Sequence, residues 1–286
     1  MSWRYATDTK SIDNLVGYIF DELKNNGGWS EIDAGYKVLR NPDGDFEVFF
    51  DLEATNKRYI QIEIGENGAW DTGSHSMGTP KISFGIVLYD GASAAGASEG
   101  TVKLSYDDGY CVLVTDYKSA GANYRRCLAY IGLAHNYKAG DTCLIGGSTL
   151  FRGGTTIPTN DSTIALACIM MHDLSGVANK PSYQSYSVGS GSWTANAPRG
   201  RIHAAKQDYR LMFPVWLGST SGYPSGGENA GIRARLETVY CGCYDDAETH
   251  GQTIIISGTT IEYSYFIQAD VTSYSHFPTH LLFRVA

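Results

Sequence analysis

The residues best suited to metal binding or catalysis gather between positions 241 and 250. Cys241 and Cys243 flank a single glycine there, and His250 follows them. Thiolate and imidazole groups are common zinc ligands, but zinc motifs separate their cysteines by about two to four residues and add a second Cys or His pair. The segment has neither feature, so its spacing argues against a metal site.

The same stretch contains three acidic residues, Asp245, Asp246 and Glu248, between two β-prone runs. Polar and acidic residues are the usual content of a solvated loop between strands. The two cysteines are the remaining special feature, because a disulfide can form where two Cα atoms approach within about 7 Å. Cys241 and Cys243 are therefore candidates for a disulfide, including one to a neighbouring subunit.

His172-Asp173 is the most enzyme-like dipeptide of the chain, because a histidine after a buried strand is where a general base can be held. No G-x-S-x-G elbow, Cys-His pattern or H-E-x-x-H accompanies it. The glycine pairs at 146–147 and 153–154 lack the G-K-[ST] step of a phosphate-binding loop. We expect no catalytic residues and no cofactor.

Paired carboxylates offer a further enzymatic possibility, since a glycoside hydrolase needs two of them facing each other across a cleft. Glu63 with Glu66, or Asp107 with Asp108, are candidates by spacing. Glu63 falls on the polar side of an expected strand and the Asp-Asp pair in an expected turn, and nothing in the sequence places them opposite each other. A structural role is the favoured interpretation.

Aromatic side chains in two long irregular segments are the best candidates for contact with a ligand or a partner. The segments are Ser182 to Arg199 and Leu217 to Gly231, both rich in Ser, Gly and Tyr. Exposed Trp and Tyr rings can stack on sugars, and the same mixture suits protein interfaces. The candidate interface or glycan-contact residues are Trp193, Tyr183, Tyr186 and Tyr223.

The composition favours short strands joined by glycine turns, with 33 Gly and 20 Tyr but only 18% charged residues. The formal charge of −8, without a cluster of Lys and Arg, argues against nucleic-acid binding. The longest apolar run, 164–171, is too short to span a bilayer, and the first residues lack a signal-peptide apolar region. We expect a soluble protein without membrane insertion.

Hydrophobic periodicity predicts one helix followed by strands. Apolar residues from Ile12 to Leu23 recur at the three-and-four spacing of an amphipathic helix, with Asp8, Thr9 or Ser11 as possible caps and Gly27-Gly28 as its end. Alternating strands follow at 46–52 and 60–64, after a turn at 41–44. The helix is expected to pack on one face of this antiparallel sheet.

The rest of the chain is predicted to be β-rich. The expected strands are 102–106 and 110–114 in a hairpin, 126–133, 163–171 (or a short buried helix), 234–240, and the pair 253–257 and 261–267. The fold class is thus mainly β, an antiparallel sandwich or barrel with an N-terminal amphipathic helix. Residues 1–90 and 101–286 form two domains or one continuous domain, joined by the flexible GASAAGASEG stretch at 91–100.

Several blocks resemble a family of virion structural proteins of tailed bacteriophages. They are NNGGW at 25–29, YIQIEIGENGAWD at 59–71, the segment 124–149 that ends in IGGST, and the segment 233–285. The last block resembles a closing pattern of strand, loop, hairpin and final strand, with matching residues Arg235, Leu236, Val239, Tyr240, Gly251, Thr253, Ile254, Gly258, Tyr263 and Phe283-Arg284-Val285. The Cys-Gly-Cys step departs from the pattern, which expects ordinary strand and loop residues there.

The resemblance implies a non-enzymatic component of the phage particle, located in the tail, baseplate or head-to-tail neck. Its partners would be copies of itself and other virion proteins, ordered around the long Tyr/Ser/Gly segments. The alternative is a receptor- or carbohydrate-binding module of the same particle. A particle-borne hydrolase would need facing carboxylates in a cleft.

Overall fold

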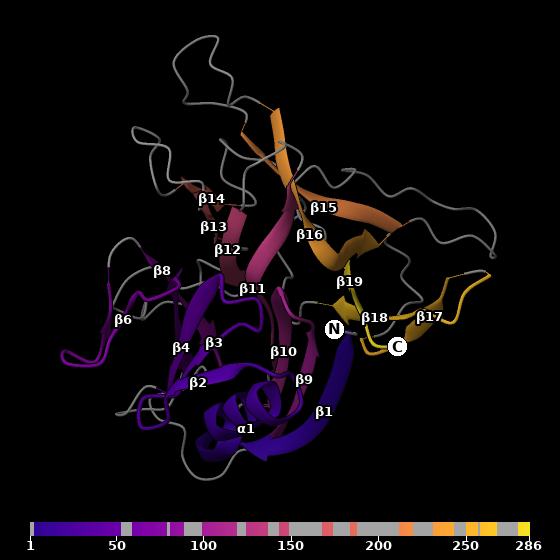
Figure 1. The fold of residues 1–286 in the computed structure, drawn as a ribbon. Coiled ribbons are helices and arrows are strands. Elements are labelled where there is room, and N and C mark those ends of the chain that lie inside the picture. Colours follow the sequence, from indigo (N-terminus) through magenta and orange to yellow (C-terminus); the bar gives the residue numbers. More distant parts are fainter. Residues whose placement is uncertain are drawn as a thin grey trace, which may run out of the picture.

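The computed structural model shows a mainly antiparallel β protein with an N-terminal helix, which confirms the predicted fold class (Figure 1). It describes residues 3–52, 59–78, 81–88, 99–118, 124–136, 143–148, 168–173, 184–187, 212–219, 231–242, 250–256, 258–267 and 280–286. All strand pairs in this part of the chain are antiparallel.

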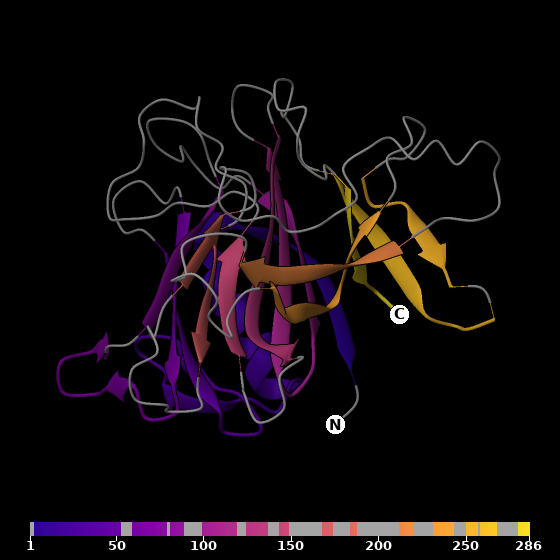
Figure 2. The same ribbon diagram turned by 90° about the horizontal axis from the view of Figure 1, so that it is seen from above.

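The largest sheet has 12 strands and curls around the molecule (Figure 2). Its main path runs in the order β1 (Arg4–Ser11), β9 (Glu99–Tyr106), β10 (Tyr110–Lys118), β11 (Tyr124–Asn136), β16 (Gly231–Gly242), β19 (His280–Arg284), β18 (Glu262–Ile267) and β17 (Thr253–Ile255). A branch from β11 adds β12 (Cys143–Ser148), β13 (Cys168–Asp173) and β14 (Gln184–Ser187), and β15 (Met212–Ser219) pairs with β16.

A second sheet of five strands comprises β2 (Ser30–Asp33), β3 (Val38–Arg40), β4 (Phe46–Leu52), β5 (Tyr59–Glu66) and β8 (Lys81–Val87). A separate two-stranded ribbon, β6 (Trp70–Asp71) and β7 (Ser76–Met77), projects from its side (Figures 1 and 2). The turn before β4 is stabilised by Asn41, whose side-chain oxygen accepts hydrogen bonds from the backbone N–H groups of Asp45 and Phe46.

The helix α1 (Ile12–Asn25) follows the predicted pattern and buries all six of its periodic apolar residues: Ile12, Leu15, Val16, Ile19, Phe20 and Leu23. Ser11 occupies the N-cap position, but its hydroxyl accepts a bond from the Asn14 side chain and caps no backbone N–H. The helix ends before Gly28, which adopts a φ of 74° that few other residues tolerate. It contacts β1, β3, β4 and β9.

One hydrophobic core lies between the helix, the five-stranded sheet and one face of the large sheet. Gly146 of β12 permits the close approach of the two sheets there, because a Cβ at this position would lie 2.7 Å from atoms of both Ile64 and Phe84. A smaller core on the opposite face of the large sheet joins Val112 and Leu128 to Leu236, Phe266 and other residues of the C-terminal strands.

Most predicted strands are present with similar bounds, including the 102–106 and 110–114 hairpin and the 253–257 and 261–267 pair. Segment 163–171 was predicted as either a strand or a short buried helix. Its described residues, from 168 on, belong to the strand β13, and residues 163–167 lie outside the described part. The strand β1 was not predicted. It pairs with β9, so residues from before position 89 and from after position 98 share one sheet and one core. The division into two domains stays a prediction.

Candidate functional site

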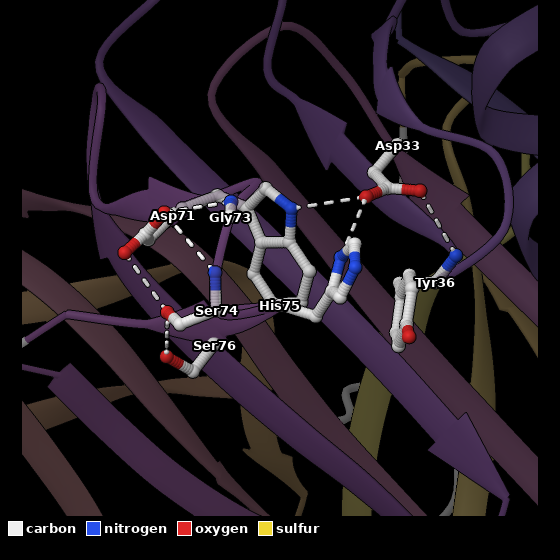
Figure 3. Close-up of polar contacts among 8 residues, drawn as sticks. Asp33, Tyr36, Asp71, Gly73, Ser74, His75 and Ser76 are labelled. Carbon is white, nitrogen blue, oxygen red and sulfur yellow. Dashed lines mark hydrogen bonds and ion pairs between the residues drawn. The ribbon is translucent and has the colours of Figure 1, made fainter.

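An exposed aromatic pair lies where the β2–β3 turn meets the β6–β7 ribbon. The rings of Tyr36 and His75 stack with centroids 4.1 Å apart and an angle of 12° between their planes. Tyr36 is 42% exposed, although large aromatic side chains are usually more buried than this. We call the group formed by Asp33, Tyr36, Trp70 and His75 the Tyr36–His75 surface (Figure 3).

Asp33 connects the members of this surface. Its Oδ1 accepts a hydrogen bond from the backbone N–H of Tyr36 at 3.2 Å, and its Oδ2 accepts one from Nε1 of Trp70 at 3.3 Å. Nδ1 of His75 lies 3.7 Å from the same Oδ2. A single carboxylate thus fixes the turn that carries Tyr36, the indole beneath it and the imidazole that stacks on it.

The loop that presents His75 is closed by Asp71. Its Oδ1 accepts backbone N–H bonds from Gly73 and Ser74, and its Oδ2 accepts the Ser74 hydroxyl at 2.9 Å. These hydrogen bonds favour the charged carboxylate, so the pKa of Asp71 lies below its usual value. The arrangement is a side-chain-stabilised turn that holds the ribbon in one shape.

Glu47 of β4 anchors the ribbon to the sheet. Its side chain is 1% exposed and pairs with Arg40, with Nη2 of Arg40 2.6 Å from Oε1. The other oxygen, Oε2, accepts the backbone N–H of Trp70 at 2.7 Å. Alternation placed Glu47 on the polar side of its strand, and the structure buries it there beneath the ribbon.

One residue of the surface and one residue next to it have a left-handed backbone. His75 has a φ of 51° and Lys37, next to Tyr36, a φ of 56°. Left-handed conformations cost side-chain-bearing residues of order 1 kcal/mol and gather at functional sites. The ammonium of Lys37 lies 4.8 Å from the ring centre of Phe20, so this cation is directed toward the helix.

The stacked rings beside a carboxylate can contact a ligand or a partner, and an Asp–His pair can also orient a general base. The nearby Ser74 hydroxyl is bonded to Asp71 and Ser76. Within the described residues, no hydroxyl or thiol forms a hydrogen bond with His75.

A second polar group surrounds His250, next to strands β10 and β11 of the large sheet. Its Nε2 is 3.5 Å from Oδ2 of Asp116, which also accepts a bond from Nε of Arg126 at 3.1 Å. Burial, together with the charges of Arg126 and Lys103, lowers the pKa of His250 to about 3, and these effects outweigh the attraction of Asp116. His250 is therefore a neutral side chain at physiological pH, packed edge-on against Phe266.

The strand β17 forms the last strand on the main path of the large sheet. The carbonyl oxygen of Gln252 accepts the backbone N–H of Tyr265 in β18 at 2.9 Å. The backbone N–H of Ile256 donates to the carbonyl oxygen of Ile261, just before β18, at 3.1 Å. Alternation in an antiparallel ladder then directs the N–H and C=O groups of Thr253 and Ile255 to the outer side. Ile255 is 62% exposed, more than any other large hydrophobic side chain in the described residues.

The residues singled out from the sequence are mostly outside the described part. Trp193, Tyr183, Tyr223 and Cys243 lie there, whereas Tyr186 and Cys241 belong to β14 and β16, whose backbone alone is described at these positions. The disulfide and the contact loops stay predictions. His172 pairs with Leu144 between β13 and β12, and Asp107 accepts backbone bonds within its turn.

Sequence reasoning missed the Tyr36–His75 surface. A lone tyrosine in a turn and a histidine in a four-residue loop carry no periodic signal, and the turn-forming types of Asp71, Gly73 and Ser74 are the only local signal for the ribbon. A search of the described residues finds no group of three or more potential metal ligands. Among the same residues, no helix combines the length and apolarity needed to cross a bilayer.

Comparison with known protein families gave no match, and comparisons with curated protein sequences and with solved structures likewise gave none.

Proposed function

We propose that this protein is a non-enzymatic structural component of a tailed-bacteriophage particle, present in several copies in the tail, baseplate or neck. The sequence blocks that resemble virion proteins motivate this assignment. The described part of the chain is compatible with it, since it consists of rigid antiparallel sheets with side-chain-stabilised turns.

The observation that carries the proposal is the outer edge of β17, which pairs with no strand among the described residues. Native proteins usually protect edge strands with charged residues or proline, because an unpaired edge pairs with other chains. The edge strands β1 and β2 contain charged residues, among them Lys10 and Glu31, and β15 contains Pro214. The edge strands β14, Gln-Ser-Tyr-Ser, and β17, Thr-Ile-Ile, have neither kind of protection, and of the two β17 carries the exposed Ile255.

An edge of this kind fits a second copy of the same chain. Two β17 strands related by a twofold axis would pair antiparallel, satisfy the outward backbone groups of Thr253 and Ile255, and continue the sheet across the interface. Burial of the exposed part of each Ile255 would contribute about 1–2 kcal/mol. The contact is small, so it suits a subunit that is held by many neighbours in a particle.

Light scattering of the purified full chain over a range of concentrations tests this pairing. The wild-type protein should form oligomers, and Ile255→Lys should shift the mass toward the monomer because it places a charge in the new sheet. Thr260→Lys is the matched control, since Thr260 is exposed in the adjoining turn and not on the edge. A wild-type monomer at every concentration would contradict self-pairing through β17.

The receptor- or carbohydrate-binding alternative draws on a different observation, the exposed Tyr36 ring. A fixed and solvent-facing aromatic ring is a recognition element that assembly through β17 does not require.

A further inference from the structure

The Tyr36 side chain is open to solvent over 42% of its surface. One of its faces is covered by the His75 imidazole at 4.1 Å. In Figure 3 its other face is turned away from all the residues drawn. An aromatic face in this setting offers stacking area, and the phenol hydroxyl adds a polar tip.

The surface is organised before any ligand arrives. Asp33 holds the Tyr36 backbone and the Trp70 indole, and it lies beside His75. The buried Glu47 fixes the Trp70 backbone from below. Because the rings are already ordered, a ligand would lose little affinity to conformational entropy.

The chemistry around the ring selects the class of ligand. The side chains presented by the β6–β7 loop are carboxylate and hydroxyl groups, namely Asp71, Ser74 and Ser76. The adjacent Lys37 is directed over Phe20, so the surface offers no paired cation for a phosphate or a carboxylate. A neutral sugar matches these groups, because its C–H face stacks on an aromatic ring and its hydroxyls bond to imidazole and hydroxyl groups.

We propose that the Tyr36–His75 surface binds neutral carbohydrate, with one sugar ring stacked on the open face of Tyr36 and its hydroxyls bonded to His75. Asp33 is the positioning residue of this site, which holds Tyr36, Trp70 and His75 in place. The inference is independent of assembly through β17, since the two surfaces lie on different sheets of the protein. A single stacked ring gives weak binding, and several copies in one particle would raise the avidity.

Native gel electrophoresis in gels that contain a soluble polysaccharide tests the site. The acidic protein migrates toward the anode, and binding retards it. The probes are dextran, galactomannan and a soluble β-glucan as neutral polymers, with alginate as an anionic polymer. At least one neutral polymer should retard the wild-type chain, and alginate should not.

Variants assign the retardation to the proposed residues. Tyr36→Ala should weaken the affinity by about fivefold or more, whereas Tyr36→Phe should retain most of it because the stacking face remains. Thr260→Ala changes an exposed residue of a turn in the large sheet, outside both proposed contacts, and should leave retardation unchanged. Asp33→Asn should weaken binding less than Tyr36→Ala does, because it loosens the positions of the rings but removes none of them.

Two results would overturn the proposal: no retardation of the wild-type chain by any neutral polymer, or equal retardation of the wild type and Tyr36→Ala. Thermal unfolding of each variant establishes that it is folded. If Tyr36→Ala blocks incorporation into particles while wild-type binding to the polymers is absent, the surface contacts a protein and the carbohydrate assignment is wrong. The light-scattering measurement tests self-pairing through β17 and is independent of all of these outcomes.

Discussion

Oε2 of Glu47 accepts the backbone N–H of Trp70 at 2.7 Å, while Oε1 pairs with Arg40. These contacts join a buried strand of the five-stranded sheet to the ribbon that presents His75. The rigidity of the exposed Tyr36–His75 surface therefore depends on a carboxylate that is itself almost inaccessible to solvent.

Glu47→Gln should destabilise the protein by about 2 kcal/mol, because it weakens a charge-assisted hydrogen bond and leaves Arg40 without its ionic partner. Chemical denaturation monitored by circular dichroism measures this change. Glu66→Gln serves as the control, since Glu66 is exposed at the end of β5, and it should change stability by less than about 0.5 kcal/mol. Equal effects of the two substitutions would contradict the anchoring role of Glu47.

His250 should make the protein less stable in mild acid. Its pKa is lowered to about 3 in the folded chain, below the ordinary value of 6.5. The unfolded chain therefore binds the proton more tightly, and the contribution of His250 to stability is complete above pH 6.5 and is lost as the pH falls toward 3. The loss by pH 5.5 should be about 1 kcal/mol.

The comparison that isolates this group is the pH dependence of the free energy of unfolding for wild type and His250→Gln between pH 7.5 and 5. The variant should show a shallower decline, whatever its stability at neutral pH. Parallel curves would mean that His250 titrates alike in the folded and unfolded chains.

Cys111 and Cys127 should not react with thiol reagents in the folded protein. Both side chains are fully buried, and burial raises the pKa of the Cys111 thiol well above its usual value. The chain has six cysteines, so a thiol-specific chromogenic reagent should label at most four before unfolding and more after it. Rapid modification of Cys111, located by peptide mass spectrometry, would contradict its burial.

The Cys241–Gly242–Cys243 step leads to a different expectation. If disulfides stabilise the assembled particle, non-reducing gels of intact particles should show at least one cross-linked species that disappears with reductant. Cys241→Ser and Cys243→Ser should remove that species. Gels that show only monomer would exclude an inter-subunit bridge.

Gly146→Ala should destabilise the fold by about 1–3 kcal/mol, because the added Cβ would lie 2.7 Å from atoms of Ile64 and Phe84 where the two sheets meet. Gly17→Ala provides a control of opposite sign, since a Cβ there meets no atom within 4 Å and alanine favours a helix interior. Thermal unfolding should separate the two variants clearly. A neutral Gly146→Ala would contradict close packing of β12 on the five-stranded sheet.

The amphipathic helix and several strands were predictable because their patterns are local. The buried residues from Ile12 to Leu23 and the alternation of Phe46, Val48 and Phe50 can be read from neighbouring positions. The strand β1 has no such pattern. Its sequence RYATDTKS is largely polar, and it is a strand because it pairs with β9 about a hundred residues later.

The candidate sites depend even more on distant contacts. Asp33 and Trp70 are brought together from different sheets, and His75 takes its place through a backbone conformation that its residue type disfavours. Neither the Asp33–Trp70 contact nor the backbone conformation of His75 can be predicted from the spacing of residues in the sequence. The glycine pair at 146–147 lies in β12, and the packing role of Gly146 at the junction of two sheets depends on contacts with distant strands.

The most direct test of the central claim is a quantitative protein analysis of density-purified phage particles from cells that produce this chain. If the chain is a structural protein of the virion, it copurifies with infectious particles in a fixed ratio of several copies per particle. Its presence in the lysate together with absence from the purified particles would contradict a structural role in the virion.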